Sequence, residues 1–283
     1  MKLHEAGRIL HPTDFSRGSE AAFAHALKLA LVTKAELEIL HVDRHPEQVP
    51  WIAFPGVRET LIRWKVLHPS ASEAEVAKLG ISVYKATVGG SNPLNSILEH
   101  IEHRPAGLIV LASHHPTGLD RLLHRDAANH FARLAKTTAL FVPHGSSGFV
   151  NADNGDIAMG QILIPFDIEP PPQPAVDTVQ ELIALLQVEQ VSCHLLHVGQ
   201  EDLPWSAPHI SAQSNTHWET IFIEGEVISG IRGFAEDHQV KLIALATHGH
   251  YGFLDILRGS TADQLLRAAR CPILAVPSLA VEP

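Results

Sequence analysis

The sequence predicts an α/β fold in which two tandem copies of one Rossmann-like unit, each an open five-stranded parallel sheet, form a pseudo-dimer. Two observations lead to this prediction. Short apolar runs alternate with stretches of helical periodicity, which is typical of βαβ units with helices on both faces of a parallel sheet. The same segments then return in the same order in the second half of the chain, which indicates a duplication.

Four pairs of similar segments define the duplication. They are Ile9–Asp14 with Ile162–Asp167, Leu40–Val42 with Leu196–Val198, Leu108–His114 with Leu242–His248, and Phe141–Pro143 with Ala275–Pro277. The distance along the chain between partners is shorter in the last two pairs than in the first two. We therefore expect the second copy to lack about one helix between its second and fourth strands.

The elements of the first copy follow from its periodicity. After a first strand that ends before Asp14, five apolar residues recur at helical spacing and predict a helix: Phe23, Ala26, Leu27, Ala30 and Leu31. The elements expected next are a strand at Glu36–Val42, a long helical stretch near Val57–Leu79, a strand at Ile81–Thr87, a helix at Pro93–His103 and a strand at Leu108–Ala112. A last helix, marked by Ala127, Phe131, Leu134 and Ala135, precedes a strand at Ala139–Val142.

The second copy follows the same plan with one difference. Gly199–Thr216 is rich in Pro and Ser where the first copy has its long helical stretch, so the second helix is expected to be reduced. His144–Gly160 gathers Gly, Ser, Asn and Asp and is the natural linker. We divide the chain into a first domain at 1–145, a linker at 146–158 and a second domain at 159–283. The two copies are expected to pack together through their final strands, Ala139–Val142 and Ile273–Val276.

The composition is that of a globular protein without a nucleic-acid partner. Of the 283 residues, 45% are hydrophobic and 18% are charged, which excludes a disordered or fibrous chain. The net charge of −10 would repel a phosphate backbone. The apolar runs are too short to span a bilayer, and two cysteines, Cys193 and Cys271, are too few for a disulfide framework. We therefore expect a cytoplasmic protein with no membrane contact.

The second copy carries a loop suited to holding phosphate. Ligands of open parallel sheets bind beyond the carboxyl ends of the strands, and the fourth strand of this copy ends in Ala246-Thr-His-Gly249. Nine residues later, Gly259-Ser260-Thr261 opens the final helix. Glycines allow close backbone approach, and a helix start offers unpaired N–H groups to an anion. A structural alternative stays open, because Ser260 and Asp263 also form a capping-box pattern that needs no ligand.

The corresponding loop of the first copy has lost these features. It reads Ala112-Ser-His-His115 and, nine residues later, Arg125-Asp126, so both later glycines are missing and an Asp replaces the Ser. A carboxylate at a helix start satisfies the N–H groups and repels phosphate. We therefore expect no ATP in the first copy, although Arg125 leaves another acidic ligand open. Asp14 in this copy is expected to be a cap or turn residue.

Taken together, the strand-end Asp, the small-x-x-Gly-x9-Gly-Ser spacing and the five-strand alternation resemble the universal stress protein family in its tandem form. The resemblance covers nearly the whole chain and implies the adenine-nucleotide-hydrolase-like variety of the Rossmann-like fold. It also implies that the second copy binds ATP or a related adenine nucleotide, in a stress-response sensor or regulator rather than a catalyst. The implied nucleotide-binding residues are Pro165, Asp167, Val198, Ala246, His248, Gly249, Gly259, Ser260 and Thr261.

The resemblance also implies a role for each part of this set. Asp167 would meet the adenine, and Val198 would line the base pocket through its backbone. The residues from Ala246 to Thr261 would surround the ribose and phosphates. Ala246 departs from the family's pattern, which has Gly at that position.

Two other functions stay open. Thr247-His-Gly-His250 matches the signature with which nucleotidyltransferases stabilise the transferring phosphates, although in those enzymes it follows the first strand and here the fourth. The other alternative is a non-nucleotide ligand-binding or protein-interaction module, with an apolar or acidic metabolite in a groove near Gly199–Thr216. Fold alone does not decide between these functions.

The 20 histidines suggest a metal hypothesis, since His114-His115 and His248-x-His250 lie near the two pocket mouths. No cysteine or carboxylate joins them at the spacing of metal ligands, so no metal site is expected. Incidental slow hydrolysis of ATP, a homodimer of the chain and an unidentified regulatory protein as partner all stay open.

Overall fold

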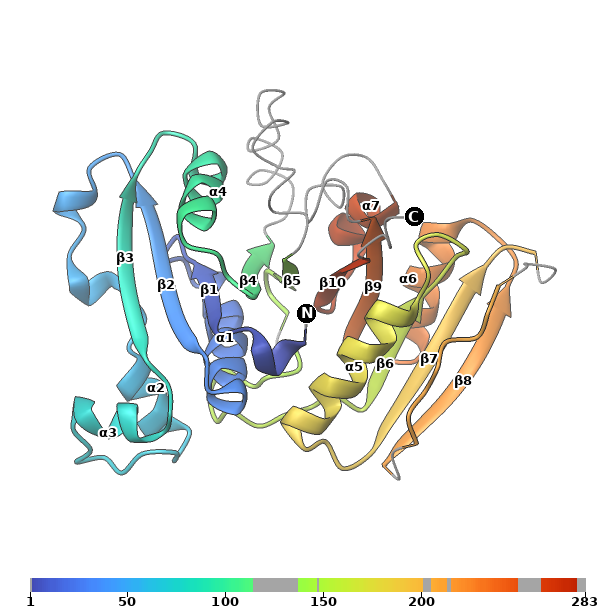
Figure 1. Ribbon diagram of the computed structural model, residues 1–283, viewed down its shortest axis with the longest axis horizontal. Helices are drawn as coiled ribbons and strands as arrows, with labels where there is room; N and C mark the ends of the chain where they lie inside the picture. The colour runs from blue at the N-terminus through green and yellow to red at the C-terminus, as the bar shows by residue number, and fades with distance from the viewer. Residues whose placement is uncertain are drawn as a thin grey trace.

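Ten strands form one continuous sheet in the computed structural model of the chain, which describes residues 2–113, 137–146, 148–200, 205–212, 215–248 and 261–278 (Figure 1). Across the sheet the strands lie in the order β3-β2-β1-β4-β5-β10-β9-β6-β7-β8. Their bounds are β1 Arg8–Pro12, β2 Glu36–Asp43, β3 Val83–Gly89, β4 Leu108–Ser113, β5 Thr138–Pro143, β6 Gln161–Pro165, β7 Val191–Val198, β8 Thr216–Ile223, β9 Leu242–His248 and β10 Ile273–Ser278. The predicted α/β class with two five-stranded halves is confirmed.

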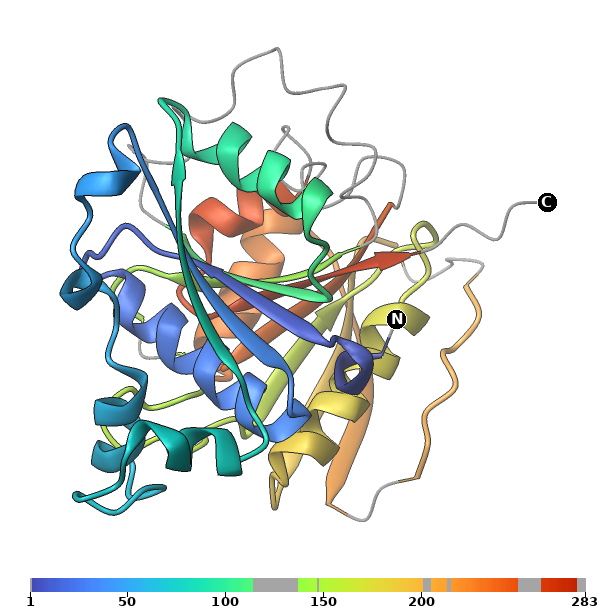
Figure 2. The same cartoon turned by 60° about the vertical axis from the view of Figure 1, so that its left-hand side comes forward.

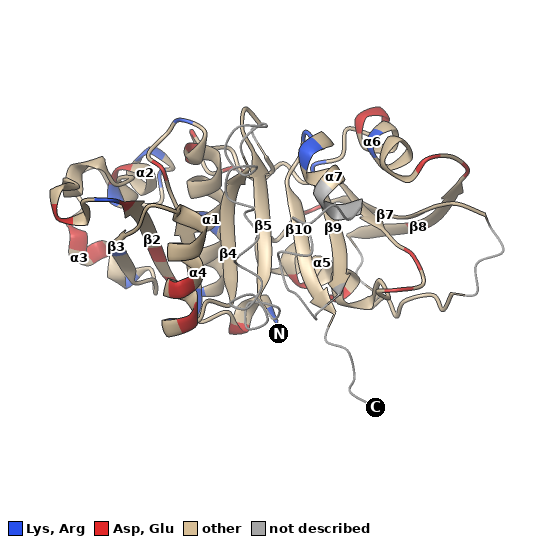
Figure 3. Cartoon of the chain, turned by 90° about the horizontal axis from the view of Figure 1, so that it is seen from above, with Lys and Arg blue, Asp and Glu red and all other residues tan. Residues whose placement is uncertain are grey.

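The two halves meet where β5 and β10 pair antiparallel. Ile273 lies opposite Phe141, and Ala275 lies opposite Ala139. Every other strand pairing in the described sheet is parallel. Figure 3 shows β5 and β10 side by side at the centre of the molecule. The predicted packing through the final strands is therefore confirmed, and each half covers a sheet edge that the other would expose.

Helices cover both faces of this sheet (Figures 1 and 2). One face carries α1 (Ser19–Thr33) and α5 (Gln173–Leu186), and the other carries α4 (Pro93–His103), α6 (Val227–Asp237) and α7 (Thr261–Ala268). Each of the two apolar layers contains residues of both halves, so the core is continuous across the junction. Central strands are therefore buried on both faces, as β5 is from Thr138 to Val142.

The long helix expected near Val57–Leu79 is wrong. Two short helices take its place, α2 (Val57–Arg63) and α3 (Glu73–Lys78). The break begins where Lys65 adopts a left-handed backbone with a φ of +59°, and a capping box between Ser72 and Glu75 then starts a new helix. Short 3-10 turns occur at η1 (Leu3–Glu5), η2 (Pro46–Gln48) and η3 (Trp51–Ala53).

The other predicted elements of the first copy are confirmed to within a few residues, apart from the helix marked by Ala127–Ala135, which lies outside the described residues. In the second copy, the described residues 205–212 between β7 and β8 contain no helix. The expected reduction of the second helix is therefore confirmed for that part of the segment.

The segment between the halves is fastened to the first copy by a buried histidine. The His25 ring on α1 is fully buried; its Nδ1 lies 2.6 Å from the Ala21 carbonyl, and its Nε2 accepts the backbone N–H groups of Phe149 and Val150 at 3.1 and 3.2 Å. Gly148 adopts a φ of +62°, and a Cβ at this position would lie 2.2 Å from the same ring. Only glycine therefore fits here without displacing His25.

The N-terminus links the two copies by a second set of contacts. The backbone N–H groups of Leu3 and His4 donate to the Glu181 carboxylate of α5 at 2.7 and 2.8 Å. A carboxylate that accepts several N–H groups makes strong charge-assisted bonds. The start of the first copy is thereby held against a helix of the second.

We predict that His25→Leu lowers the free energy of unfolding by at least about 2 kcal/mol, because it leaves two buried N–H groups without an acceptor. Urea unfolding at pH 7.5 measures this loss. His103→Leu is the matched control, since His103 also lies within hydrogen-bond distance of a carbonyl four residues earlier but is exposed. An equal loss in both variants would contradict the role of His25 in fastening the linker.

The stabilising contribution of His25 should depend on pH. Burial lowers the pKa of His25 from 6.5 to about 4, so the folded protein favours the neutral ring. The contribution is complete above pH 6.5 and is lost as the pH falls from 6.5 towards 4. The stability difference between wild type and His25→Leu, measured by urea unfolding at several pH values, should therefore shrink over this range.

Candidate functional site

The carboxyl ends of three neighbouring strands bring part of the predicted site together. β6 lies between β9 and β7, and the chain leaves β6 towards β7 and returns on the other side as β9. This reversal makes the edge between β6 and β9 a switch point of the kind where open α/β sheets bind ligands. Pro165, Asp167, Val198 and Ala246 all lie at this edge.

Asp167 and its repeat partner Asp14 have different surroundings. The Asp14 carboxylate accepts the Ser16 backbone N–H at 3.0 Å and the Ser19 hydroxyl at 2.7 Å, which makes it a turn residue before α1, as predicted. The Asp167 carboxylate is exposed and accepts the N–H of its neighbour Ile168 at 2.8 Å. Helix α5 begins further along at Gln173, and its cap position makes no side-chain bond. Asp167 therefore keeps acceptor capacity that Asp14 has used.

Aromatic side chains build the wall next to Asp167. Phe166 is buried, and its ring centroid lies 4.4 Å from that of Trp205 and 5.6 Å from that of His197. Nδ1 of His197 lies 3.1 Å from the Phe166 carbonyl, which fixes the end of β6 against the end of β7. Phe222 of β8 packs against both Phe166 and His197 and completes this aromatic wall. Sequence reasoning missed this wall.

The first copy repeats the histidine contact with a different wall. Nδ1 of His41 lies 2.7 Å from the Thr13 carbonyl, just before Asp14. The Phe15 ring stacks on His41 with centroids 3.9 Å apart, and Phe54 packs against the edge of Phe15. The signal was visible in the repeated Leu-His-Val segments, since a histidine kept in both copies at a strand end indicates a shared structural role.

The phosphate side of the predicted site is placed only at its two ends. β9 ends at His248, whose backbone pairs with Ser278, and α7 begins at Thr261. Ala246 is partly buried against the core. Gly249, Gly259 and Ser260 lie outside the described residues, as do the side chains of His248 and Thr261.

With this geometry in place, the chain can be compared with known proteins. A sequence model of the universal stress protein family matches residues 5–143 and 207–277, which is more than half of the chain. The chain belongs to the universal stress protein family. The two matched regions fall in the two copies, so the predicted resemblance is confirmed.

Relatives of this universal stress protein support the tandem arrangement. A universal stress protein of Methanocaldococcus jannaschii is 28% identical over 141 residues, which cover 48% of this chain and 81% of that protein. The crystal structure of a universal stress protein from Archaeoglobus fulgidus is 14% identical with a TM-score of 0.59, covering 96% of this chain and 99% of that chain. A functionally unknown protein from Pseudomonas aeruginosa is 15% identical with a TM-score of 0.59, covering 97% and 94%. The last two show that the fold extends over both copies.

The segment that replaces the second helix of this universal stress protein packs onto α5. The Gln173 amide bonds the backbone of His209 in both directions, at 2.7 and 3.1 Å, and the Gln180 amide donates to the Ser211 carbonyl at 2.9 Å. Trp205 and Ile210 pack against the core. Residues 205–211 thus pack on α5 and the core, whereas Asn215 and Thr216 at the end of the segment border a hollow of about 730 Å³ beside β6 and β7.

The enzyme alternative gains no support from Thr247. This first residue of Thr247-His-Gly-His250 is buried, and its hydroxyl donates to the Val276 carbonyl of β10 at 3.4 Å. The Thr247 hydroxyl is therefore bonded to the neighbouring strand. Gly249 and His250 lie outside the described residues.

Two further expectations concern metals and membranes. Within the part of the chain that the structure describes, no three His, Cys, Asp or Glu side chains gather as a metal ion would require. Among the same residues, no helix has the length and apolar character needed to cross a bilayer.

We predict that Asp14→Ala lowers the free energy of unfolding by about 1 kcal/mol, since it removes the turn bonds before α1. Asp167→Ala should change it by less than about 0.5 kcal/mol, because the exposed carboxylate bonds only its own neighbour among the described residues. Denaturant unfolding of the two matched variants compares them directly. An equal loss in both would show that Asp167 also has a structural role.

Proposed function

We propose that the second copy binds ATP or a related adenine nucleotide and that the protein is a cytoplasmic stress-response regulator rather than a catalyst. The observation that carries the proposal is the exposed Asp167 carboxylate at the switch point between β6 and β9, next to an aromatic wall. Membership of the universal stress protein family supports it.

The base would bind at the side of the site that the structure describes. The Asp167 carboxylate would accept a hydrogen bond from the exocyclic amino group of adenine. Pro165 and the backbone of Val198 would line the base pocket. The face of an aromatic ring stacks well on a nucleobase, and Trp205 is half-buried beside Phe166. Trp205 is therefore the described side chain best suited to cover the base.

The phosphates would bind between β9 and α7. Ala246 and His248 lead into this loop, and Gly249, Gly259, Ser260 and Thr261 would supply close backbone approach, N–H groups and hydroxyls. The start of α7 at Thr261 puts the positive end of a helix at the same place. The first copy would bind no ATP, because Asp126 stands where the second copy has Ser260.

A regulatory role fits the groups that the structure places around the site. Of the described side chains at this edge, the Asp167 carboxylate bonds the Ile168 N–H at the end of β6, and the His197 ring lies against the Phe166 carbonyl in β7, away from the loop between β9 and α7. Occupancy would instead change the contacts that this edge makes with a regulatory protein or with a second copy of the chain.

The test is to denature purified protein, look for released nucleotide, and titrate ATP by calorimetry. We expect one ATP per chain, lost in Gly259→Asp, which replaces a glycine of the loop by a carboxylate that would repel the phosphates. Asp167→Ala should weaken binding about tenfold, which corresponds to one hydrogen bond to a charged acceptor.

Asp14→Ala is the matched control and should leave ATP affinity unchanged. The absence of both released nucleotide and binding heat at millimolar ATP would overturn the proposal. Two ATP molecules per chain would overturn the assignment to the second copy alone.

A further inference from the structure

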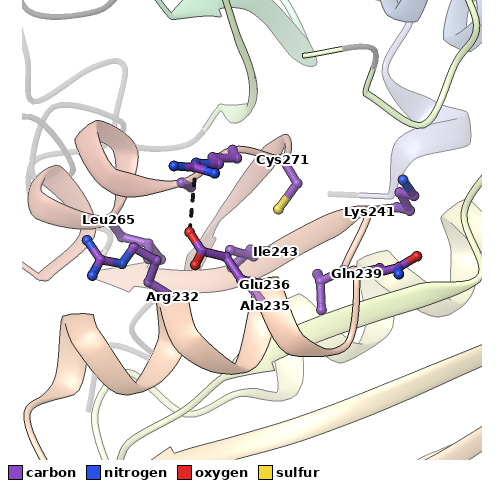
Figure 4. A pocket seen from close by; sticks show the side chains of 11 residues that line it. Arg232, Ala235, Glu236, Gln239, Lys241, Ile243, Leu265 and Cys271 are labelled. Carbon is purple, nitrogen blue, oxygen red and sulfur yellow. Dashed lines mark ion pairs between the residues drawn. The ribbon is translucent and has the colours of Figure 1, made fainter. Parts of the chain in front are cut away.

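A cavity lies away from the proposed nucleotide edge, between α6, α7 and the amino ends of β9 and β10 (Figure 4). Its volume is about 320 Å³. The residues that line it are Arg232, Ala235, Glu236, Gln239, Val240, Lys241, Ile243, Leu265, Ala269, Arg270 and Cys271. Lys241 and Ala246 lie towards opposite ends of β9, and strand residues advance about 3.3 Å each. The cavity and the nucleotide site are therefore separate.

The internal repeat shows how α6 differs from its equivalent helix at the residues that border this cavity. α4 and α6 are equivalent helices of equal length in the two copies. In α4, Leu98 and Ile101 are buried at 1% and 3% exposure and fill the space over the sheet. Arg232 and Ala235 occupy these positions in α6, and both line the cavity instead. α6 still covers the sheet with Ile231, which is 3% exposed, but it carries a cation and a small residue where α4 has Leu98 and Ile101.

The floor of the cavity is apolar. Val240, Ile243 and Leu265 are buried, and Figure 4 shows the Cys271 thiol directed towards Ile243 and Glu236. Burial raises the pKa of the Cys271 thiol to about 12, so the thiol is protonated and adds to the apolar lining. The floor therefore suits a hydrocarbon body rather than a polar one.

The rim is cationic. Arg232, Lys241 and Arg270 border the cavity, and Glu236 is the one carboxylate in the lining. The Glu236–Arg270 pair is 3.8 Å long and the Arg270 side chain is 86% exposed, so this pair holds Arg270 loosely. Three cations around an apolar floor are unusual in a chain with a net charge of −10, and Figure 3 shows basic positions on both α6 and α7.

We propose that this cavity binds a small amphiphilic carboxylate, with its apolar body against Ile243 and Leu265 and its carboxylate at Arg232 and Arg270. Charge complementarity selects an anion, because the guanidinium groups match a carboxylate in planar geometry. The apolar floor excludes a ligand that is polar throughout, since burying its unpaired groups is unfavourable. The volume lies at the small end of the range of ligand pockets, which selects a compact molecule.

The probe is octanoate, titrated by calorimetry against the full chain. Octanol has the same body without the charge, acetate has the same charge without the body, and octylammonium reverses the charge. We expect octanoate to bind and to be at least tenfold tighter than each of the three. Equal binding of octanol would overturn the role of the cations, and equal binding of acetate would overturn the role of the floor.

Substitutions in the cavity test where the ligand binds. Arg232→Gln with Arg270→Gln should weaken octanoate binding at least tenfold, whereas Arg267→Gln, which removes a charge from α7 outside the cavity, should not change it. Ala235→Ile restores the residue type of Ile101 and should abolish binding without lowering the melting temperature. Ala235→Ser, of similar size to alanine, should keep binding.

Three results would overturn the proposal. They are no binding of octanoate at millimolar concentration, retention of binding in Ala235→Ile, and an equal effect of Arg267→Gln. Because the two sites are separate, Asp167→Ala should leave octanoate binding unchanged. Failure of ATP binding and failure of octanoate binding are thus independent outcomes.

Discussion

The antiparallel pairing of β5 with β10 is the constraint on which the rest of the structure depends. An open five-stranded sheet exposes a row of unpaired backbone groups at each edge. Joining the two sheets through Phe141 and Ile273 removes one edge from each and makes both apolar layers continuous across the chain. The linker held by His25 and the N-terminal bonds to Glu181 add further contacts that hold this arrangement.

The two copies share one backbone fold but carry different side chains at equivalent positions. Glu38 of β2 is fully buried, forms ion pairs with Arg8 and with Arg104 at 3.0 Å, and lies 2.8 Å from Nε2 of His100. At the equivalent position of β7, His194 instead lies 2.5 Å from Glu219 and 2.7 Å from Gln161. Both arrangements pair a buried polar side chain with polar partners from neighbouring elements, so the backbone frame tolerates either. Divergence at the ligand edges is therefore compatible with a common fold.

Much of the fold was predictable because it depends on local apolar patterns. The helix at Pro93–His103 was predicted with the observed bounds, and the repeated strands predicted the central pairing of the sheet. The long helix at Val57–Leu79 was predicted wrongly although Ser72 and Glu75 have the spacing of a capping box. The contacts of His25 and Trp205 were not predictable, because their partners are distant in the sequence and become neighbours only after folding. The lining of the cavity was beyond reach for the same reason, although Arg232 and Ala235 already stood opposite Leu98 and Ile101 in the repeat.

Helix α7 connects the two ends of the second copy. It begins at Thr261, beside the predicted phosphate loop, and Leu265 on the same helix lines the cavity. Eight residues of helix span about 12 Å. A ligand held against Leu265 therefore contacts the element whose first turn would face the phosphates. If occupancy of one site favours one position of α7, linkage requires the other ligand to respond by the same factor. The difference between the copies would then matter for function, because in the sequence only the second copy has a glycine-containing loop before its final helix, and the cavity lies beneath that helix.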